Sequence, residues 1–487
     1  MWNLHGAKRV ICLAGCLAMA YLQLTTSPAT IEFARAHGGS GLHIGILGAL
    51  PTLMLFMQFL AGMLVNHLKY RRALWMGVSL LQRLAFVPLA IGAWLWPDLP
   101  GETWVWGLIL ATAVNQSLTH FGNPLWMSWM GDYLPHKGLS EFWGNRHLWQ
   151  QWTAAGTLAV SALVIFRCGL DPMTSFSALI VVGAVLGISD VLLFSHIEEP
   201  PVKAAQNPQI WKVLKAPFQN PSYFSFIKFT CFWHFAAMIG SPFISMYMLE
   251  EVGLSLFGVL QLWSAAWAGG AIFSRGMGRL AERFGQRPVL VLCTAFKPLN
   301  MLSLLICPSD PTLAFWFLVP MFMVDAVLNA GINIGSNGFM LKQSPSENRA
   351  MFVAAGTALA GTIGGITAIA SGFALKQLSG WSWELGGYTV VGFHVLFGLS
   401  LAFRCLAVHL ARALDEPTAT RTRDVLRILL LEPALAWGKI SPEEAASDVE
   451  PAPVLLSIAS APSDSEIVRL DAITRDRLRE AQHQRAA

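Results

Sequence analysis

The stretch Gly278–Pro288 reads GRLAERFGQRP and separates two long apolar runs. An acid follows the first glycine by four positions, and arginines stand on both sides of a second glycine, Gly285. This pattern predicts a cationic tight turn between two hydrophobic helices, on the membrane face that collects positive charge. A weaker copy of this stretch begins at Gly62, which precedes Gly278 by somewhat less than half the length of the chain. This copy includes Arg71 and Arg72. The two copies indicate that the chain contains an internal duplication.

The composition is that of a protein that crosses a membrane several times. Of 487 residues, 54% are hydrophobic and 13% are charged, against about 25% charged in an average soluble domain. A spanning helix needs about 20 apolar residues, and residues 9–410 divide into twelve such segments. The apolar runs are long and do not alternate with period two, which favours helices over a membrane barrel. We therefore expect an all-α membrane protein.

Further matches follow the duplication in the same order along the chain. Ser27-Pro28 matches Ser241-Pro242, and Arg83 matches Lys297. The same number of residues separates the two members of each match. In a later segment a slightly shorter offset relates two pairs, Asn115 to Asp325 and Asn123 to Asn333. Each match is weak alone, but their common order predicts an internal repeat.

The opening stretch closely resembles the loop motif of the major facilitator superfamily, G-x-L-a-D-R-x-G-R-R. The motif positions are filled by Gly278, Leu280, Glu282, Arg283, Gly285 and Arg287, with Glu where Asp is usual. The first copy departs from the motif, because Asn66 replaces the acid and Lys69 replaces the turn glycine. The resemblance implies twelve transmembrane helices in two pseudo-symmetric six-helix bundles. The expected divisions are a first half at 1–195, a cytoplasmic linker at 196–221, a second half at 222–410 and a soluble cytoplasmic tail at 411–487.

Charges in the joins between apolar segments predict the orientation in the membrane. Bases gather in the even-to-odd joins and acids in the odd-to-even joins, so the positive-inside rule places both termini in the cytoplasm. We expect an integral protein of the cytoplasmic (inner) membrane. The N-terminus superficially resembles a signal peptide. An uncleaved first helix is favoured because the stretch contains the polar residues Thr25, Thr26 and Ser27, and because the internal repeat requires a helix here.

The resemblance implies that the loop motif forms part of an inner gate. An acid and arginines across a tight turn can hold the inner face closed through charge-assisted contacts; the alternative is the plain topological role of positive residues. A second candidate group lies after the fourth and the tenth expected helices. It resembles the Pro–acid–Arg segment that recurs in the superfamily, and its charged members could form ion pairs. The gating candidates are Gly62, Asn66, Arg71, Arg72, Asp132, Arg146, Gly278, Glu282, Arg283, Gly285, Arg287, Glu347 and Arg349.

Polar residues inside apolar segments are the candidates for contact with a solute or a coupling ion. An ionisable group at membrane depth is costly and usually faces protein or water. Asp325, Asn329 and Asn333 recur at every fourth position and share a helix face, which predicts a cavity lining; the alternative is a hydrogen-bonded seam between helices. Four residues of an earlier segment form the counterpart face: Asn115, Gln116, His120 and Asn123.

Other candidates follow from kinked helices, aromatic residues and buried cations. The resemblance implies that the Pro-containing first and seventh helices line the cavity, which adds Gln23, Thr26 and His234. Gln261 and Trp263 could contact a sugar ring, although most tryptophans are expected at the membrane interfaces. The intramembrane cations Arg83 and Lys297 either tie neighbouring helices together or bind an anionic substrate.

The sequence favours a secondary active transporter of a small polar solute, by alternating access. Amides, hydroxyls and Trp on the candidate face favour a sugar or glycoside, and coupling to a proton or sodium is expected because no GxxxxGK[ST] motif appears. The alternatives are efflux of amphipathic compounds and a transporter-fold receptor or scaffold that signals through its tail. We expect no enzyme activity, cofactor, metal site or nucleic-acid partner, and a monomer in contact with membrane lipid.

Overall fold

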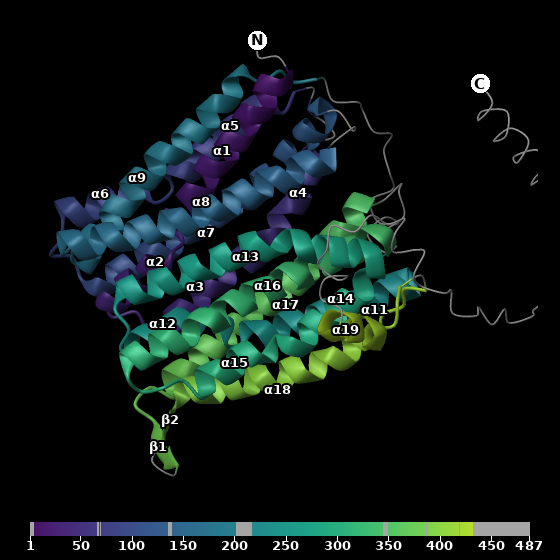
Figure 1. The fold of residues 1–487 in the computed structure, drawn as a ribbon. Coiled ribbons are helices and arrows are strands. Elements are labelled where there is room, and N and C mark those ends of the chain that lie inside the picture. The colour runs from purple at the N-terminus through teal and green to yellow at the C-terminus, as the bar shows by residue number, and fades with distance from the viewer. Residues whose placement is uncertain are drawn as a thin grey trace, which may run out of the picture. The chain divides into compact units, whose positions relative to one another are not determined.

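The structure is a computed structural model that describes residues 4–65, 68, 70–134, 139–200, 217–343, 349–385, 388–417 and 419–431. The described chain is almost entirely helical (Figure 1). Most of the expected linker and most of the expected tail lie outside the described residues, as does Asn66.

The first part of the chain forms nine helices, which we call the N-terminal helices. They are α1 (Leu4–Thr25), α2 (Pro28–Ala36), α3 (Gly41–Leu53), α4 (Met57–Val65), α5 (Arg72–Leu84), α6 (Val87–Leu95), α7 (Gly101–Tyr133), α8 (Leu139–Cys168) and α9 (Pro172–Leu193). Two short 3-10 turns, η1 (Met54–Phe56) and η2 (Phe194–His196), follow α3 and α9.

The second part forms the C-terminal helices, which are followed by one further helix. They are α11 (Pro221–Met238), α12 (Ile244–Glu250), α13 (Leu256–Phe284), α14 (Gln286–Phe296), α15 (Pro298–Leu305), α16 (Pro311–Gln343), α17 (Arg349–Gln377) and α18 (Gly392–Arg412), with the turn η3 (Ser241–Phe243) before α12. A two-stranded antiparallel hairpin, β1 (Ser382–Leu385) and β2 (Tyr388–Val391), joins α17 to α18 and pairs Ser382 with Val391. The last described helix is α19 (Thr422–Leu431).

The helices have the length and composition of membrane spans. Within the described residues, nine helices are long and apolar enough to cross a bilayer, and the apolar segment Gly41–Phe56 is shorter. The long helices α7 and α8 have 33 and 30 residues, which exceeds the length that a span requires. The chain is therefore an all-α membrane protein, as the sequence predicts, while the count of twelve spans stays a prediction.

Proline and glycine break several of the expected spans into two pieces. The first expected span divides at Ser27, whose side chain caps α2, with Pro28 as the first residue of that helix. Its repeat counterpart divides in the same way at Ser241 and Pro242, between α11 and α12. Proline lacks the backbone donor that a helix interior requires, so each break follows from the residue itself.

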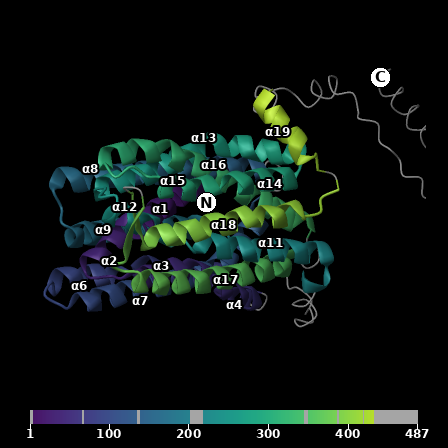
Figure 2. The ribbon, with the colours of Figure 1, turned by 90° about the horizontal axis from the view of Figure 1, so that it is seen from below.

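Two long contacts join the N-terminal helices to the C-terminal helices. Helix α3 packs along α17, and α8 packs along α13, as Figures 1 and 2 both show. Small residues allow the first contact: a side chain at Gly45 would meet the α17 backbone at Ala368 and Gly372, at 2.6 and 2.8 Å. Gly361 and Gly365 on α17 approach Thr52 and Leu53 of α3 just as closely.

Among the side chains that the structure describes, the hydrophobic core is continuous across both sets of helices at one end only. At the end that holds α2, α6 and α12, a single buried cluster includes Phe33, Phe86 and Phe176 together with Phe243 and Tyr247. At the other end the buried residues form separate clusters within the N-terminal helices and within the C-terminal helices. We call the first end the joined end; the second lies beside the N-terminus of α1 in Figure 1.

Candidate functional site

The intramembrane cation Arg83 on α5 forms a buried ion pair with Asp190 on α9. Its Nε and Nη2 atoms lie 3.0 and 2.7 Å from Asp190 Oδ2, and both side chains are buried or nearly so. The guanidinium also lies over the ring of Tyr21, 4.3 Å from its centroid. A charged group at this depth requires such a partner, and the pair ties α5 to α9.

The second intramembrane cation, Lys297, pairs with Asp325 on α16. Its Nζ atom lies 2.6 Å from Asp325 Oδ1 and donates to the Asp325 carbonyl at 3.2 Å. A second buried cation, Arg404 on α18, donates to Ser400 and to Ser241 of η3, and lies over the ring of Trp233. Its Nη1 atom is buried with no hydrogen-bond partner. The group of Lys297, Asp325 and Arg404 thus holds two cations and one acid.

The repeat relates these two charged groups. The number of residues from Asp190 to Arg404 equals the number from Arg83 to Lys297. Asp190 and Arg404 therefore occupy corresponding positions of the repeat. The acid sits on α9 in the first group and on α16 in the second, and a cation occupies the α18 position that corresponds to Asp190. Asp190 and Arg404 were not predicted as site residues, although they are separated by the same number of residues as Arg83 and Lys297.

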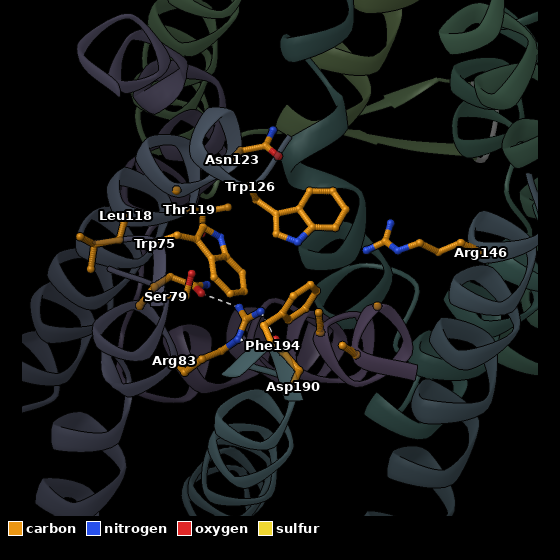
Figure 3. A pocket seen from close by; sticks show the side chains of 15 residues that line it. Trp75, Ser79, Arg83, Leu118, Thr119, Asn123, Trp126, Arg146, Asp190 and Phe194 are labelled. Carbon is orange, nitrogen blue, oxygen red and sulfur yellow. Dashed lines mark hydrogen bonds and ion pairs between the residues drawn. The ribbon is translucent and has the colours of Figure 1, made fainter. Parts of the chain in front are cut away.

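A cavity of about 170 Å³ lies among the N-terminal helices next to Arg83. Figure 3 shows its polar wall, with Arg83 and Asp190 on one side and Asn123 and Thr119 on another. The indole of Trp126 lies beside the space, and small residues of α1, among them Gly15, complete the wall.

Arg146 on α8 enters this cavity from the side opposite Arg83 (Figure 3). Its guanidinium lies 4.9 Å from the Trp126 ring centroid and 5.5 Å from that of Trp143. The sequence analysis expected Arg146 among ion pairs that include Asp132, but Asp132 instead pairs with Arg71 at 2.8 Å.

The counterpart face on α7 contains both structural and accessible polar groups. Asn115 is buried and its Nδ2 atom donates to Tyr21 Oη at 2.6 Å and to the Gln82 carbonyl at 3.1 Å. Gln116 is buried, and His120 contacts the Pro51 carbonyl at 2.8 Å. Asn123 is exposed and lines the cavity, so it is the member of the set most available to a solute.

The face of α16 that the sequence singled out is partly accessible. Asp325 has 18% of its side chain exposed, and Asn329 Nδ2 donates to Asp325 Oδ2 at 3.2 Å. Asn329 and Asn333 are both exposed. An acid and two amides on one face of an apolar helix can offer hydrogen bonds to a polar solute.

The remaining candidates make local contacts. Thr26 donates to the Leu22 carbonyl, and His234 contacts the Thr230 carbonyl at 2.9 Å. Trp263 donates to Ser245 Oγ at 3.2 Å. Gln23 is buried, whereas Gln261 is only half-buried.

Arg71 is the centre of a charged group at the end opposite the joined end. Its side chain is fully buried and donates to Asp132 at 2.8 Å and to Ser128 at 2.5 Å. Glu199, which follows α9, accepts from the backbone N–H groups of Arg71 and Arg72. The carboxylate therefore caps the start of α5, where the helix dipole favours negative charge.

The second loop copy has a similar cap from an acid that follows α18. Glu416 Oε2 accepts from the backbone N–H of Arg287 at 2.7 Å, and Arg287 Nη2 donates to the Arg412 carbonyl. Gly285 turns the chain with φ of 98°, a conformation that glycine adopts without strain. Glu199 and Glu416 thus perform the same local task, one at each copy of the loop.

The other gating candidates differ in what the structure describes of them. Glu282 and Arg283 are exposed at the end of α13, Gly278 lies in that helix, and Gly62 lies in α4. Glu347 lies outside the described residues, and of Arg349 only the backbone, at the start of α17, is described.

A family model described as the Major Facilitator Superfamily matches residues 11–369. The chain belongs to this superfamily. The match covers both loop copies and both charged groups except Arg404. No curated protein matches the chain.

Solved structures of the superfamily fold are similar to the chain over most of its length. A mutant form of the nucleoside transporter NupG has a TM-score of 0.65 at 16% identity, covering 85% of this chain and 100% of that one. A D-xylose–proton symporter has a TM-score of 0.61 at 14% identity, with 85% and 98% covered. A bacterial homologue of the human lysosomal transporter Spinster, in an inward-facing and occupied conformation, has a TM-score of 0.61 at 12% identity, with 84% and 97% covered. These similarities show a shared fold.

Proposed function

We propose that the chain is a secondary transporter that moves a small hydroxylated solute, of the sugar or nucleoside kind, across the cytoplasmic membrane. The observation that supports this most is the polar cavity beside Arg83 and Asp190, inside helices that are otherwise apolar. Polar groups at membrane depth are costly, and they commonly mark a pathway for a solute or an ion. Two of the similar structures are transporters of a nucleoside and of D-xylose, which both contain a sugar ring.

Alternating access is the proposed mechanism. The hydrophobic core joins the two sets of helices at one end only, so rocking of one set against the other would open that end and close the opposite one. With both termini in the cytoplasm, as the positive charges predict, the joined end faces outward and this conformation is open to the cytoplasm.

Asp325 is the proposed site of proton coupling. It is a partly accessible acid at membrane depth, 2.6 Å from Lys297 Nζ, and Asn329 contacts its other oxygen. Protonation would neutralise Asp325 and weaken its attraction to Lys297, which changes how tightly α14 and α16 are held together. A proton taken up on one side and released on the other would then accompany each solute.

Replacement of Asp325 tests this proposal. The variant Asp325→Asn keeps the shape of the side chain and removes the titrating oxygen, so proteoliposomes with an inside-alkaline gradient should no longer accumulate solute. Exchange of labelled for unlabelled solute needs no net proton movement and should persist. Accumulation that stays at the wild-type level would contradict coupling at Asp325.

The matched control is Asp310→Asn. Asp310 is an exposed carboxylate just before α16, where it accepts from the Leu313 N–H at 2.8 Å. An asparagine can make the same contact, so this variant should accumulate solute as the wild type does. A loss in both variants would indicate damage to α16 and not loss of coupling.

A further inference from the structure

We propose that the transported solute bears an anionic group, a carboxylate or phosphate, and that Arg146 binds this group in the cavity. This proposal rests on the proposed transport function and specifies its substrate class. The cavity wall contains a cation, Arg146, that forms no ion pair with a described acid. An aromatic ring lies beside this cation.

Arg146 has few partners for a guanidinium at this depth. Its Nη1 atom donates to Gln150 Oε1 at 3.2 Å, and its Nε atom is buried without a hydrogen-bond partner. Among the side chains that the structure describes, no acid lies within ion-pairing distance of it. Two indoles face the cation, but neither provides a compensating charge.

The acid of the cavity is already engaged elsewhere. Asp190 Oδ2 accepts from both Nε and Nη2 of Arg83, at 3.0 and 2.7 Å, whereas Asp190 attracts Arg146 only over a longer range. The described wall therefore has one positive charge in excess, and Arg146 is its source. A solute with one negative charge would satisfy it, and a guanidinium can bind a carboxylate or phosphate through two parallel hydrogen bonds.

The shape of the site fits a solute with a single ring. Drug-sized ligands occupy pockets of about 300–1,000 Å³, whereas this cavity has a volume of about 170 Å³. The hydroxyl- and amide-bearing Thr119 and Asn123 can contact ring hydroxyls, and the Trp126 indole offers a flat apolar surface. Gly15 leaves room for the cation, because a side chain there would meet Arg146 Nε at 2.7 Å.

The test compares matched charged and neutral probes on the purified full-length protein. Binding of D-glucuronate and D-glucose 6-phosphate, and of the neutral parent D-glucose, is measured by calorimetry and thermal shift. At least one anionic probe should bind ten times more tightly than D-glucose. Arg146→Gln should remove this preference, and Arg146→Lys, which retains the charge, should keep part of it.

The control variant is Arg167→Gln, at the exposed end of the same helix α8. It should bind both probe classes as the wild type does, and melting curves of all variants report folding. The proposal is overturned if no anionic probe binds more tightly than D-glucose, or if folded Arg146→Gln retains the preference. Anion binding without uptake in liposomes would refute the transport function and leave only anion binding at Arg146 standing, whereas uptake of neutral sugars alone would support transport and overturn the anionic substrate.

Discussion

At the scale of single residues, the ion pair of Arg83 and Asp190 places one cation and one acid on the cavity wall. Asp190 is nearly fully buried, and Arg83 has only 13% of its side chain exposed. Removing one partner leaves the other charge buried and unpaired, which costs about 3–5 kcal/mol in typical proteins. The pair thus holds α5 against α9 and leaves Arg146 as the cation available to a solute.

Asp190→Asn should lower the free energy of unfolding by about 3 kcal/mol, because Arg83 keeps its charge without a partner. Denaturant unfolding in detergent, followed by tryptophan fluorescence, measures the change. Asp98→Asn, in the exposed loop before α7, is the control and should change stability by less than about 0.5 kcal/mol. Equal effects of the two variants would show that the pair contributes little.

The sequence alone singled out Arg83 in the first charged group and both Lys297 and Asp325 in the second, but it did not predict the ion pairs that they form. Arg83 and Lys297 stand out because a cation inside an apolar segment is rare. Their partners could not be predicted, because the acid comes from α9 in one group and from α16 in the other. Asn115 looked like a cavity residue for a similar reason: the pattern indicates a polar helix face, but only the fold shows that Tyr21 and the Gln82 carbonyl engage this amide.

At the scale of the elements, local capping and proline positions determine where the helices begin and bend. Asp171 caps α9: its Oδ2 atom accepts from the N–H groups of Met173 and Thr174, each at 3.1 Å, with Pro172 as the first helical residue. Hydrogen bonds from the side chain and backbone of Thr174 lower the pKa of Asp171 below its usual value. Since the folded pKa is the lower one, the stabilisation is present at neutral pH and is lost as pH falls through it.

Asp171→Ala should destabilise the protein by about 1 kcal/mol at pH 7, the usual cost of a lost N-cap. The difference from wild type should shrink as pH falls below about 4, the usual pKa of an aspartate, toward the lower pKa that Asp171 has in the folded protein. Asp171→Asn is the control, because asparagine caps well but does not titrate. Melting temperatures at pH 7 and pH 3 measure both effects, and an alanine penalty that is the same at both pH values would contradict the titration of the cap.

The elements themselves were largely predictable. Long apolar runs indicated the spanning helices, and Ser-Pro at 27–28 and 241–242 indicated the two bends. The hairpin β1–β2 was not predicted, because its segment, residues 382–391, falls at the boundary of an apolar run.

At the scale of the whole molecule, the two sets of helices share one buried core at the joined end, which is the feature behind the proposed alternating access. The joined end includes the contact between α3 and η3, where a side chain at Gly48 would meet Pro242 Cβ at 2.6 Å. The sequence predicted two related sets of helices but could not predict at which end they share a core, since a transporter that alternates as we propose would adopt both arrangements with one sequence.

The most direct test of alternating access is to hold the joined end closed. In a background in which the native cysteines are replaced by serine, Gly48→Cys and Pro242→Cys place two thiols at the contact between α3 and η3, where the two Cβ atoms must move apart from 2.6 Å to the separation of about 3.5–4.5 Å that a disulfide requires. The control variants carry Gly48→Cys or Pro242→Cys alone in the same background, and neither can form the bridge. Uptake into proteoliposomes is measured for labelled glucose, glucuronate and uridine, before and after reduction.

The account predicts that the wild type accumulates at least one of these solutes. We also expect that the oxidised 48–242 bridge stops uptake, that reduction restores it, and that oxidation leaves uptake by the two single-cysteine variants intact. Uptake at an unchanged rate with the 48–242 bridge closed would contradict alternating access, and failure of the folded wild type to accumulate any of the three solutes would contradict the proposed transport function.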